Sequence, residues 1–231
     1  MTEDHGLGIA LAILAFVIAV ILHELAHGYV ARALGDSTAS QAGRLSLNPL
    51  SHIDRFGSVL LPLMLYIGQM LTLGRVDFMF GWAKPVPVDP SRFRYPRQGM
   101  AIVAVAGPAT NFALALLGAF GLATFGAHGL SGAFFVDFIQ FNLLLGLFNL
   151  LPLPPLDGGR IVAGILPARL ALYYAQIERA GILTILAVVL VLPWALSQIG
   201  IHFDPVGAVL NRLVPGIGNI MLRLAGAHVR F

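Results

Sequence analysis

The sequence His23-Glu24-Leu25-Ala26-His27 lies inside an apolar segment that runs from Leu7 to about Leu34. No charged residue precedes Glu24 in this segment, and a helix needs about 20 apolar residues to cross the hydrocarbon core of a bilayer. Ionisable side chains inside such a segment cost at least a few kcal/mol each and usually mark a functional site. The segment therefore predicts a membrane helix that carries a polar site.

The spacing of the polar residues indicates which chemistry this site performs. On a helix, His23 and His27 are one turn apart and face the same side. Two imidazoles at that spacing can bind one zinc ion, and the Glu24 carboxylate can reach a metal-bound water as a general base. The alternative, polar residues that line a contact between helices, leaves these ionisable groups unexplained in an apolar run. We predict a zinc-dependent hydrolytic site with one Zn²⁺ per chain.

Composition assigns the whole chain to the membrane class. Of its 231 residues, 58% are hydrophobic and 11% are charged, whereas a soluble domain carries roughly 25% charge. These values exclude an ordinary soluble enzyme and a disordered chain. The basic residues are 13 Arg and one Lys, scattered as headgroup anchors are, so we expect a lipid bilayer and no nucleic acid as partner. Cysteine is absent, which excludes thiolate chemistry.

Further apolar segments follow the first one. They cover residues 56–73, 99–126, 134–151 and 180–199, and a tail at 205–229 is either interfacial or a weak sixth segment. We predict an all-α polytopic membrane protein with about five transmembrane helices and a re-entrant segment at 56–73, broken at Pro62 or Gly68. The proline-rich stretch 81–89 predicts a small extended or β hairpin at the membrane surface. A single domain would span 1–231, with a catalytic core at about 7–170, an additional span at 180–199 and the amphipathic tail.

A third metal ligand must come from elsewhere, because catalytic zinc takes three protein ligands and leaves a fourth position for water. Asp157 has the best context. Three prolines precede it, at 152, 154 and 155, and a broken backbone at membrane depth is tolerated only where it lines a cavity or is buried in protein. The alternative is that Asp157 caps the helix that begins beside it.

Three motifs together resemble the site-2 protease family of intramembrane zinc metalloproteases. They are His23-Glu24-x-x-His27, Gly107-Pro108-x-x-Asn111 and Asn149-x-x-Pro152-x-Pro154-x-Leu156-Asp157-Gly158, and the resemblance covers roughly residues 10–170. It implies that His23, His27 and Asp157 are zinc ligands and that Glu24 is the catalytic acid and base. It also implies that Asn111 sits by the active centre and helps to hold the substrate strand or the oxyanion, and that Asn149 binds substrate. Many relatives carry an appended regulatory domain for which this chain has no room, so it resembles a minimal form.

The metal constrains the topology, since its ligands must meet at one depth. Segment 134–151 must then run in the direction of the first segment, with 99–126 antiparallel to both. Segment 56–73 must return to its own side. This arrangement gathers the basic residues of the polar loops on one face, as the positive-inside rule requires of the cytoplasm. We predict an integral multi-pass protein, in the plasma (inner) membrane of a prokaryote, with the active site towards the cytoplasmic side.

The predicted activity is hydrolysis of a peptide bond in or near a transmembrane helix of a membrane-protein substrate. Such a helix must unwind, and stretch 81–89 could offer an edge to the unwound strand, with Gly81, Val86 and Val88 in contact with it. That stretch could equally be a surface loop. His52 could lie near the site, be a spare ligand, or be an interfacial residue near a helix start. The alternatives to a protease are a non-proteolytic zinc-binding protein (a transporter or helix-binding relative) and a hydrolase of lipid or prenylated substrates.

Overall fold

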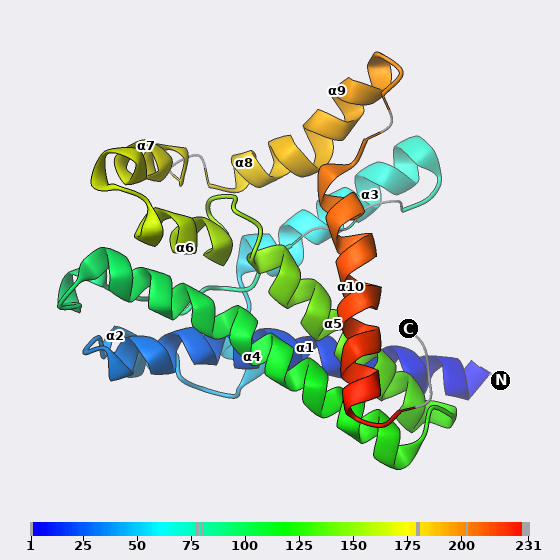
Figure 1. Ribbon diagram of the computed structural model, residues 1–231. Coiled ribbons are helices and arrows are strands. Elements are labelled where there is room, and N and C mark those ends of the chain that lie inside the picture. The colour runs from blue at the N-terminus through cyan, green and yellow to red at the C-terminus, as the bar shows by residue number, and fades with distance from the viewer. Residues whose placement is uncertain (1, 77–78, 80, 179–180, 202, 228–231) are drawn as a thin grey trace.

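The computed structural model describes residues 2–76, 79, 81–178, 181–201 and 203–227, and no strand occurs in these ranges. The first half of the chain forms α1 (Thr2–Ala33), α2 (Thr38–Gln41), η1 (Pro49–His52), η2 (Arg55–Leu60), α3 (Leu61–Leu73), η3 (Pro90–Arg92) and α4 (Pro96–Phe125). The second half forms α5 (Gly129–Asn149), α6 (Asp157–Ile165), α7 (Ala168–Glu178), α8 (Ile182–Leu186), η4 (Ala187–Val191), α9 (Leu192–Gln198) and α10 (Pro205–Leu224). The all-α class predicted from the sequence is confirmed (Figure 1).

Three helices in the described ranges, α1, α4 and α5, are long and apolar enough to cross a membrane. They correspond to the predicted segments 7–34, 99–126 and 134–151. The predicted total of about five is not reached by this criterion, because α3 has 13 residues and residues 183–198 form a shorter apolar helix. The three long helices make the chain a multi-pass membrane protein.

The long helices pack closely, with α4 antiparallel to α1 and α5 (Figure 1). Residue pairs between α1 and α4 fix this direction, since His27 contacts Val103 and His23 contacts Asn111. Small residues at the contacts let the backbones approach, as is usual between membrane helices. Fully buried alanines on α1 and α4 are Ala15, Ala19, Ala31, Ala115 and Ala119. The relative directions of the three helices agree with the topology that the metal site requires.

Helix α10, which covers most of the tail predicted over 205–229, belongs to the core. Its buried face, which includes Val206, Leu210 and Leu222, packs on α4 and α5. The helix begins at Pro205, whose missing N–H is tolerated in a first turn, and the Asp204 side chain accepts a hydrogen bond from the Gly207 N–H at 2.9 Å. The tail is therefore one amphipathic helix that closes the apolar surface of α4 and α5.

After residue 57 the chain forms a helical excursion, and residues 81–82 lie beside residue 57 again. Residues 55–73 are helical throughout, as a π-helical turn followed by α3, so the reversal predicted at Pro62 or Gly68 is absent. Both ends of the excursion nevertheless meet, because the Trp82 N–H donates to the Gly57 oxygen at 3.2 Å and a Cβ on Gly81 would lie 2.6 Å from that same oxygen. The chain thus reverses after α3, and its placement relative to a bilayer stays a prediction.

The stretch 81–89 holds no helix and no strand in the described chain, so the predicted hairpin stays a prediction. Its prolines favour an extended backbone, and we call it the extended stretch. Other segments hold it at both ends. The Lys84 N–H donates to the His52 oxygen at 2.8 Å, and the Asp89 N–H donates to Asp36 Oδ2 at 2.7 Å. Asp36, directly after α1, is fully buried. One carboxylate therefore ties this extended stretch to the end of α1.

Several hydrogen-bond donors surround the Asp36 carboxylate. Burial raises the pKa of Asp36, but hydrogen bonds from Thr38 and Asp89 and the charge of Arg92 outweigh burial and hold the pKa below its ordinary value. Since the folded-state pKa is the lower one, this contribution to stability is complete at neutral pH and is lost as the pH falls through the folded-state pKa.

Asp36→Ala removes that carboxylate and leaves buried N–H donors without an acceptor. We expect the free energy of unfolding to fall by about 2 kcal/mol, measured by thermal unfolding in detergent. Asp89→Ala, which truncates a partly exposed carboxylate on the same stretch, is the matched control and should change stability less. Equal losses in the two variants would contradict the role given to Asp36.

Candidate metal centre

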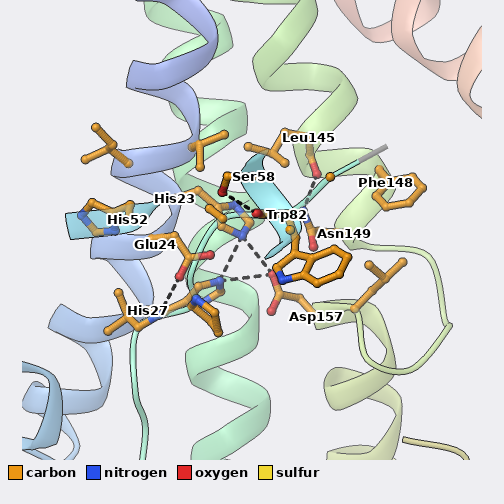
Figure 2. A pocket seen from close by; sticks show the side chains of 18 of the residues that line it. His23, Glu24, His27, His52, Ser58, Trp82, Leu145, Phe148, Asn149 and Asp157 are labelled. Carbon is orange, nitrogen blue, oxygen red and sulfur yellow. Dashed lines mark hydrogen bonds and ion pairs between the residues drawn. The ribbon is translucent and has the colours of Figure 1, made fainter. Parts of the chain in front are cut away.

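Three side chains from two distant parts of the chain meet between α1 and α6 (Figure 2). The Nε2 atoms of His23 and His27 are 3.0 Å apart. Asp157 Oδ2 lies 3.2 Å from each of them. All three side chains are buried. The convergence predicted from the sequence is therefore present.

The hydrogen bonds around the two imidazoles set their protonation. The Val103 carbonyl can only accept, so the His27 Nδ1 that lies 2.8 Å from it carries the proton. His23 Nδ1 likewise faces Asn111 Oδ1 at 2.6 Å. In neutral imidazoles both Nε2 atoms then hold a lone pair, and these lone pairs meet the Asp157 oxygen. Three acceptors that converge without a proton between them are the donor set of a cation site.

The distances also fit a metal ion. Ligand atoms about 2.0–2.1 Å from one tetrahedral ion lie about 3.3 Å from one another, close to the 3.0 and 3.2 Å separations found here. Asp157 Oδ2 is buried and accepts no hydrogen bond within the described chain. An uncompensated buried carboxylate oxygen is costly, and a bound cation would remove that cost. His23, His27 and Asp157 can therefore hold a divalent metal ion.

The proline-rich break after α5 brings Asp157 to the histidines. Helix α5 ends at Asn149, and the loop that follows folds back on this end before α6 begins at Asp157. A Cβ on Gly158 would collide with the carbonyl oxygens of Leu150 and Leu151, and a Cβ on Gly159 would lie 2.8 Å from the Pro154 nitrogen. The two glycines thus permit the tight return that carries the carboxylate inwards.

Gly107 of α4 faces the two imidazoles directly. A Cβ at this position would lie 2.5 Å from His23 Cε1 and 2.5 Å from His27 Nε2. Any larger residue would displace the rings. The glycine of the Gly107-Pro108-x-x-Asn111 motif therefore allows α4 to lie close to the metal ligands.

Glu24 lies beside the ligands and faces the extended stretch (Figure 2). Its Oε2 accepts a hydrogen bond from the Val86 N–H at 2.9 Å. Glu24 and the three ligands line one cavity of about 860 Å³. The carboxylate is therefore available to a molecule in the cavity beside the metal position.

Apolar side chains form much of the cavity wall, including Phe16, Val20 and Phe148 of the long helices. Gly81, Val86 and Val88 also line it, as does Asn149. Asn149 donates to the Leu145 carbonyl of its own helix at 3.0 Å. All four residues predicted to contact substrate thus lie at the cavity, where their proposed role stays a prediction.

Asn111 lies beside the active centre, as predicted, in contact with His23. It is fully buried and does not line the cavity. Its oxygen faces His23, and its nitrogen donates to Asn142 Oδ1 at 2.9 Å and to the Ala19 oxygen at 3.3 Å. Its predicted contact with a substrate strand or an oxyanion stays a prediction.

Two further residues lie at or near the site. His52 is buried and lines the cavity, with Nε2 2.8 Å from the Ser46 oxygen, which agrees with the alternative that places it near the site. Asn142 of α5 is fully buried behind Asn111. The only sequence signal for Asn142 is an amide in the middle of an apolar segment.

Several known proteins are similar in sequence to this chain. The profile of peptidase family M50 matches residues 127–192, which include α5 and Asp157. A relative named "Putative zinc metalloprotease YwhC", from Bacillus subtilis (strain 168), is 40% identical over 183 residues, which are 75% of this chain and 77% of the relative. The chain belongs to peptidase family M50, the site-2 protease family.

Two further relatives, Rip2 and Rip3, are also named putative zinc metalloproteases. Rip2 of Mycolicibacterium smegmatis is 34% identical over 152 residues, 64% of this chain and 54% of Rip2. Rip3 of Mycobacterium tuberculosis (strain ATCC 25618 / H37Rv) is 35% identical over 182 residues, 77% of this chain and 34% of Rip3. No solved structure gives a significant match.

Gly107→Ala tests the packing of α4 against the imidazoles. The added methyl must push His23 or His27 aside, so we expect the affinity for a divalent metal to fall about 10- to 100-fold, measured by chelator competition. Gly118→Ala on the same helix is the control, because its methyl meets Ile139 and Phe138 at 3.0 and 3.1 Å and should affect packing alone. Unchanged metal affinity in Gly107→Ala would refute the site geometry.

Proposed function

We propose that the protein is a zinc-dependent endopeptidase that hydrolyses a peptide bond in or near a transmembrane helix of a membrane-protein substrate. The observation that carries the proposal is the buried set of His23, His27 and Asp157 beside Glu24, with both histidines and Glu24 on a helix of membrane-spanning length. Membership of peptidase family M50 supports the reaction class.

Zinc is the metal that the donor set favours. Two imidazole nitrogens and one carboxylate oxygen are ligands that zinc accepts at a catalytic site with one open position. The relatives are named zinc metalloproteases. We therefore assign one Zn²⁺ per chain, held by His23, His27 and Asp157.

Glu24 performs the proton transfers of hydrolysis in this proposal. Bound zinc polarises the scissile carbonyl and makes water nucleophilic at neutral pH. The Glu24 carboxylate takes a proton from the attacking water and gives it to the leaving nitrogen as the peptide C–N bond breaks. The Val86 N–H, 2.9 Å from Oε2, holds the carboxylate beside the reaction site without consuming its second oxygen.

The position of the site within an apolar, membrane-spanning helix supports one substrate class. His23 and His27 lie on α1 in the region long and apolar enough to span a membrane, and apolar side chains of α1 and α5 line the cavity. A membrane-spanning segment brings apolar residues to this depth at no cost in desolvation, whereas a soluble peptide would have to partition into the bilayer. A transmembrane helix that unwinds locally is therefore the fitting substrate.

The extended stretch offers a free backbone N–H, that of Ala83, to such a segment. Trp82 and Lys84 donate their N–H groups to the Gly57 and His52 oxygens. Ala83, between them, makes no backbone hydrogen bond within the described chain. Residue 85 is a proline without an N–H, and the N–H of Val86 donates to Glu24. We infer that Ala83 pairs with the unwound substrate by strand addition.

The orientation in the membrane follows from basic residues near the site. Arg44 donates to the Lys84 carbonyl at 2.9 Å, and Arg92 lies 3.7 Å from the Asp36 carboxylate. These groups lie at the end of α1 that follows His27. Under the positive-inside rule this end faces the cytoplasm, so we assign the active site to the cytoplasmic side of a prokaryotic inner membrane.

A transporter that binds zinc would require further ionisable ligands along a path through the spans. In the part of the chain that the structure describes, one group of three potential metal ligands occurs. A single enclosed site with a neighbouring carboxylate favours hydrolysis over transport.

Glu24→Gln removes the proton acceptor and preserves the shape of the side chain. We expect cleavage of a membrane-helix substrate by purified, reconstituted protein to fall by at least 100-fold, with metal content unchanged. Asp157→Ala should lose both metal and activity, and a chelator should stop the wild-type protein. Cleavage that persists in Glu24→Gln would refute the assigned mechanism.

Ala83→Pro deletes one N–H from the proposed edge and suits an extended backbone. The loss of one hydrogen bond to substrate should reduce cleavage about tenfold, while zinc affinity stays constant. Ala83→Ser keeps the N–H and serves as the control. Equal cleavage by the proline and serine variants would exclude strand addition at Ala83.

A further inference from the structure

A chain of hydrogen bonds connects His23 to the interior of α5. His23 Nδ1 and Asn111 Oδ1 are 2.6 Å apart, Asn111 Nδ2 donates to Asn142 Oδ1 at 2.9 Å, and Asn142 Nδ2 donates to the Phe138 carbonyl at 2.8 Å. The chain crosses α1, α4 and α5, and both asparagines are fully buried. Neither amide lines the catalytic cavity.

The direction of every bond in this chain is fixed from its far end. The Phe138 carbonyl can only accept, so the amide nitrogen of Asn142 must point to it and the amide oxygen of Asn142 must point to Asn111. Asn111 must then turn its nitrogen towards Asn142 and the Ala19 carbonyl, and its oxygen towards His23. An oxygen at that position requires a proton on His23 Nδ1.

The position of this proton decides whether His23 can bind metal. A neutral imidazole with its proton on Nδ1 keeps a lone pair on Nε2, which faces Asp157 and His27. A reversed Asn111 amide would present its NH₂ group to Nδ1 and favour the proton on Nε2, where it would block the ligand position. His27 needs no such chain, because its Nδ1 faces the Val103 carbonyl directly.

We propose that Asn142 is a positioning residue for the metal centre, which fixes the orientation of the Asn111 amide and thereby the ligating tautomer of His23. The inference rests on the metal site of the proposed function and extends it to a residue that touches neither metal nor substrate. Two fully buried amides inside spanning helices are costly unless every hydrogen-bonding group is satisfied. In this chain each amide has both a donor and an acceptor partner.

The test compares two variants of Asn142 with a packing control. Asn142→Leu has a similar volume but offers no acceptor to Asn111. Asn142→Asp, in its protonated form, has the same shape, accepts from Asn111 through its carbonyl oxygen and donates to Phe138 through its hydroxyl. Leu143→Ala truncates the neighbouring, fully buried side chain of the apolar core and leaves the amides intact.

Zinc affinity by chelator competition and thermal unfolding of the metal-free protein are measured for each full-length variant in detergent. Outer partners of metal ligands change affinity by about 10- to 100-fold, so we expect a loss of about tenfold in Asn142→Leu and of threefold or less in Asn142→Asp. Leu143→Ala should lower the unfolding temperature without weakening zinc binding.

The outcomes separate this inference from the proposed function. A wild-type protein that binds no zinc would refute the metal site itself. Wild-type zinc affinity in Asn142→Leu would refute the positioning role alone. An equal loss of zinc affinity in Asn142→Leu and Leu143→Ala would also refute it, because general loss of packing would then explain both.

Discussion

Three lone pairs that point at one another are the constraint on which the rest of this structure depends. His23 Nε2, His27 Nε2 and Asp157 Oδ2 lie 3.0–3.2 Å apart and buried, a geometry that repels unless a cation occupies the centre. Their burial weakens the screening of that repulsion by water. Three features bring the Asp157 carboxylate to the two imidazoles. They are the parallel directions of α1 and α5, the proline-rich break after α5, and the loop that folds back on the end of α5 before α6.

The surrounding protein gives each polar group of this centre its own hydrogen-bond partner. A backbone carbonyl orients His27, while two amides orient His23, and a backbone N–H holds Glu24. Glycines act at the points of closest approach: Gly107 beside the imidazoles, and Gly158 and Gly159 where the chain folds back on the end of α5. A polar site at membrane depth therefore needs a complete set of hydrogen-bond partners as much as it needs its ligands.

The extended stretch couples the site to the loops at the end of α1. Asp36 holds one end, His52 holds the other, and Val86 reaches Glu24 between them. The excursion through α3 begins and ends against Gly57. The same backbone that holds Glu24 thus presents Ala83 to the cavity, so in the proposed mechanism binding of an unwound segment and proton transfer would depend on one element.

The sequence by itself determined the membrane class, the three long helices, the motif on α1 and the choice of Asp157 as the residue that meets the two histidines. These follow from local properties: the length of apolar runs, the helical period that aligns His23 with His27, and the prolines that must end α5 before Asp157. The sequence predicts a break inside 56–73, whereas this segment is helical and the chain reverses only after α3. The sequence places Asn111 by the active centre but does not name His23 as its partner. It leaves the position of His52 open and assigns no role to Asn142. Only the tertiary structure decided these points, because the partner of a buried amide or imidazole lies on another helix and its direction depends on carbonyls far away in the chain.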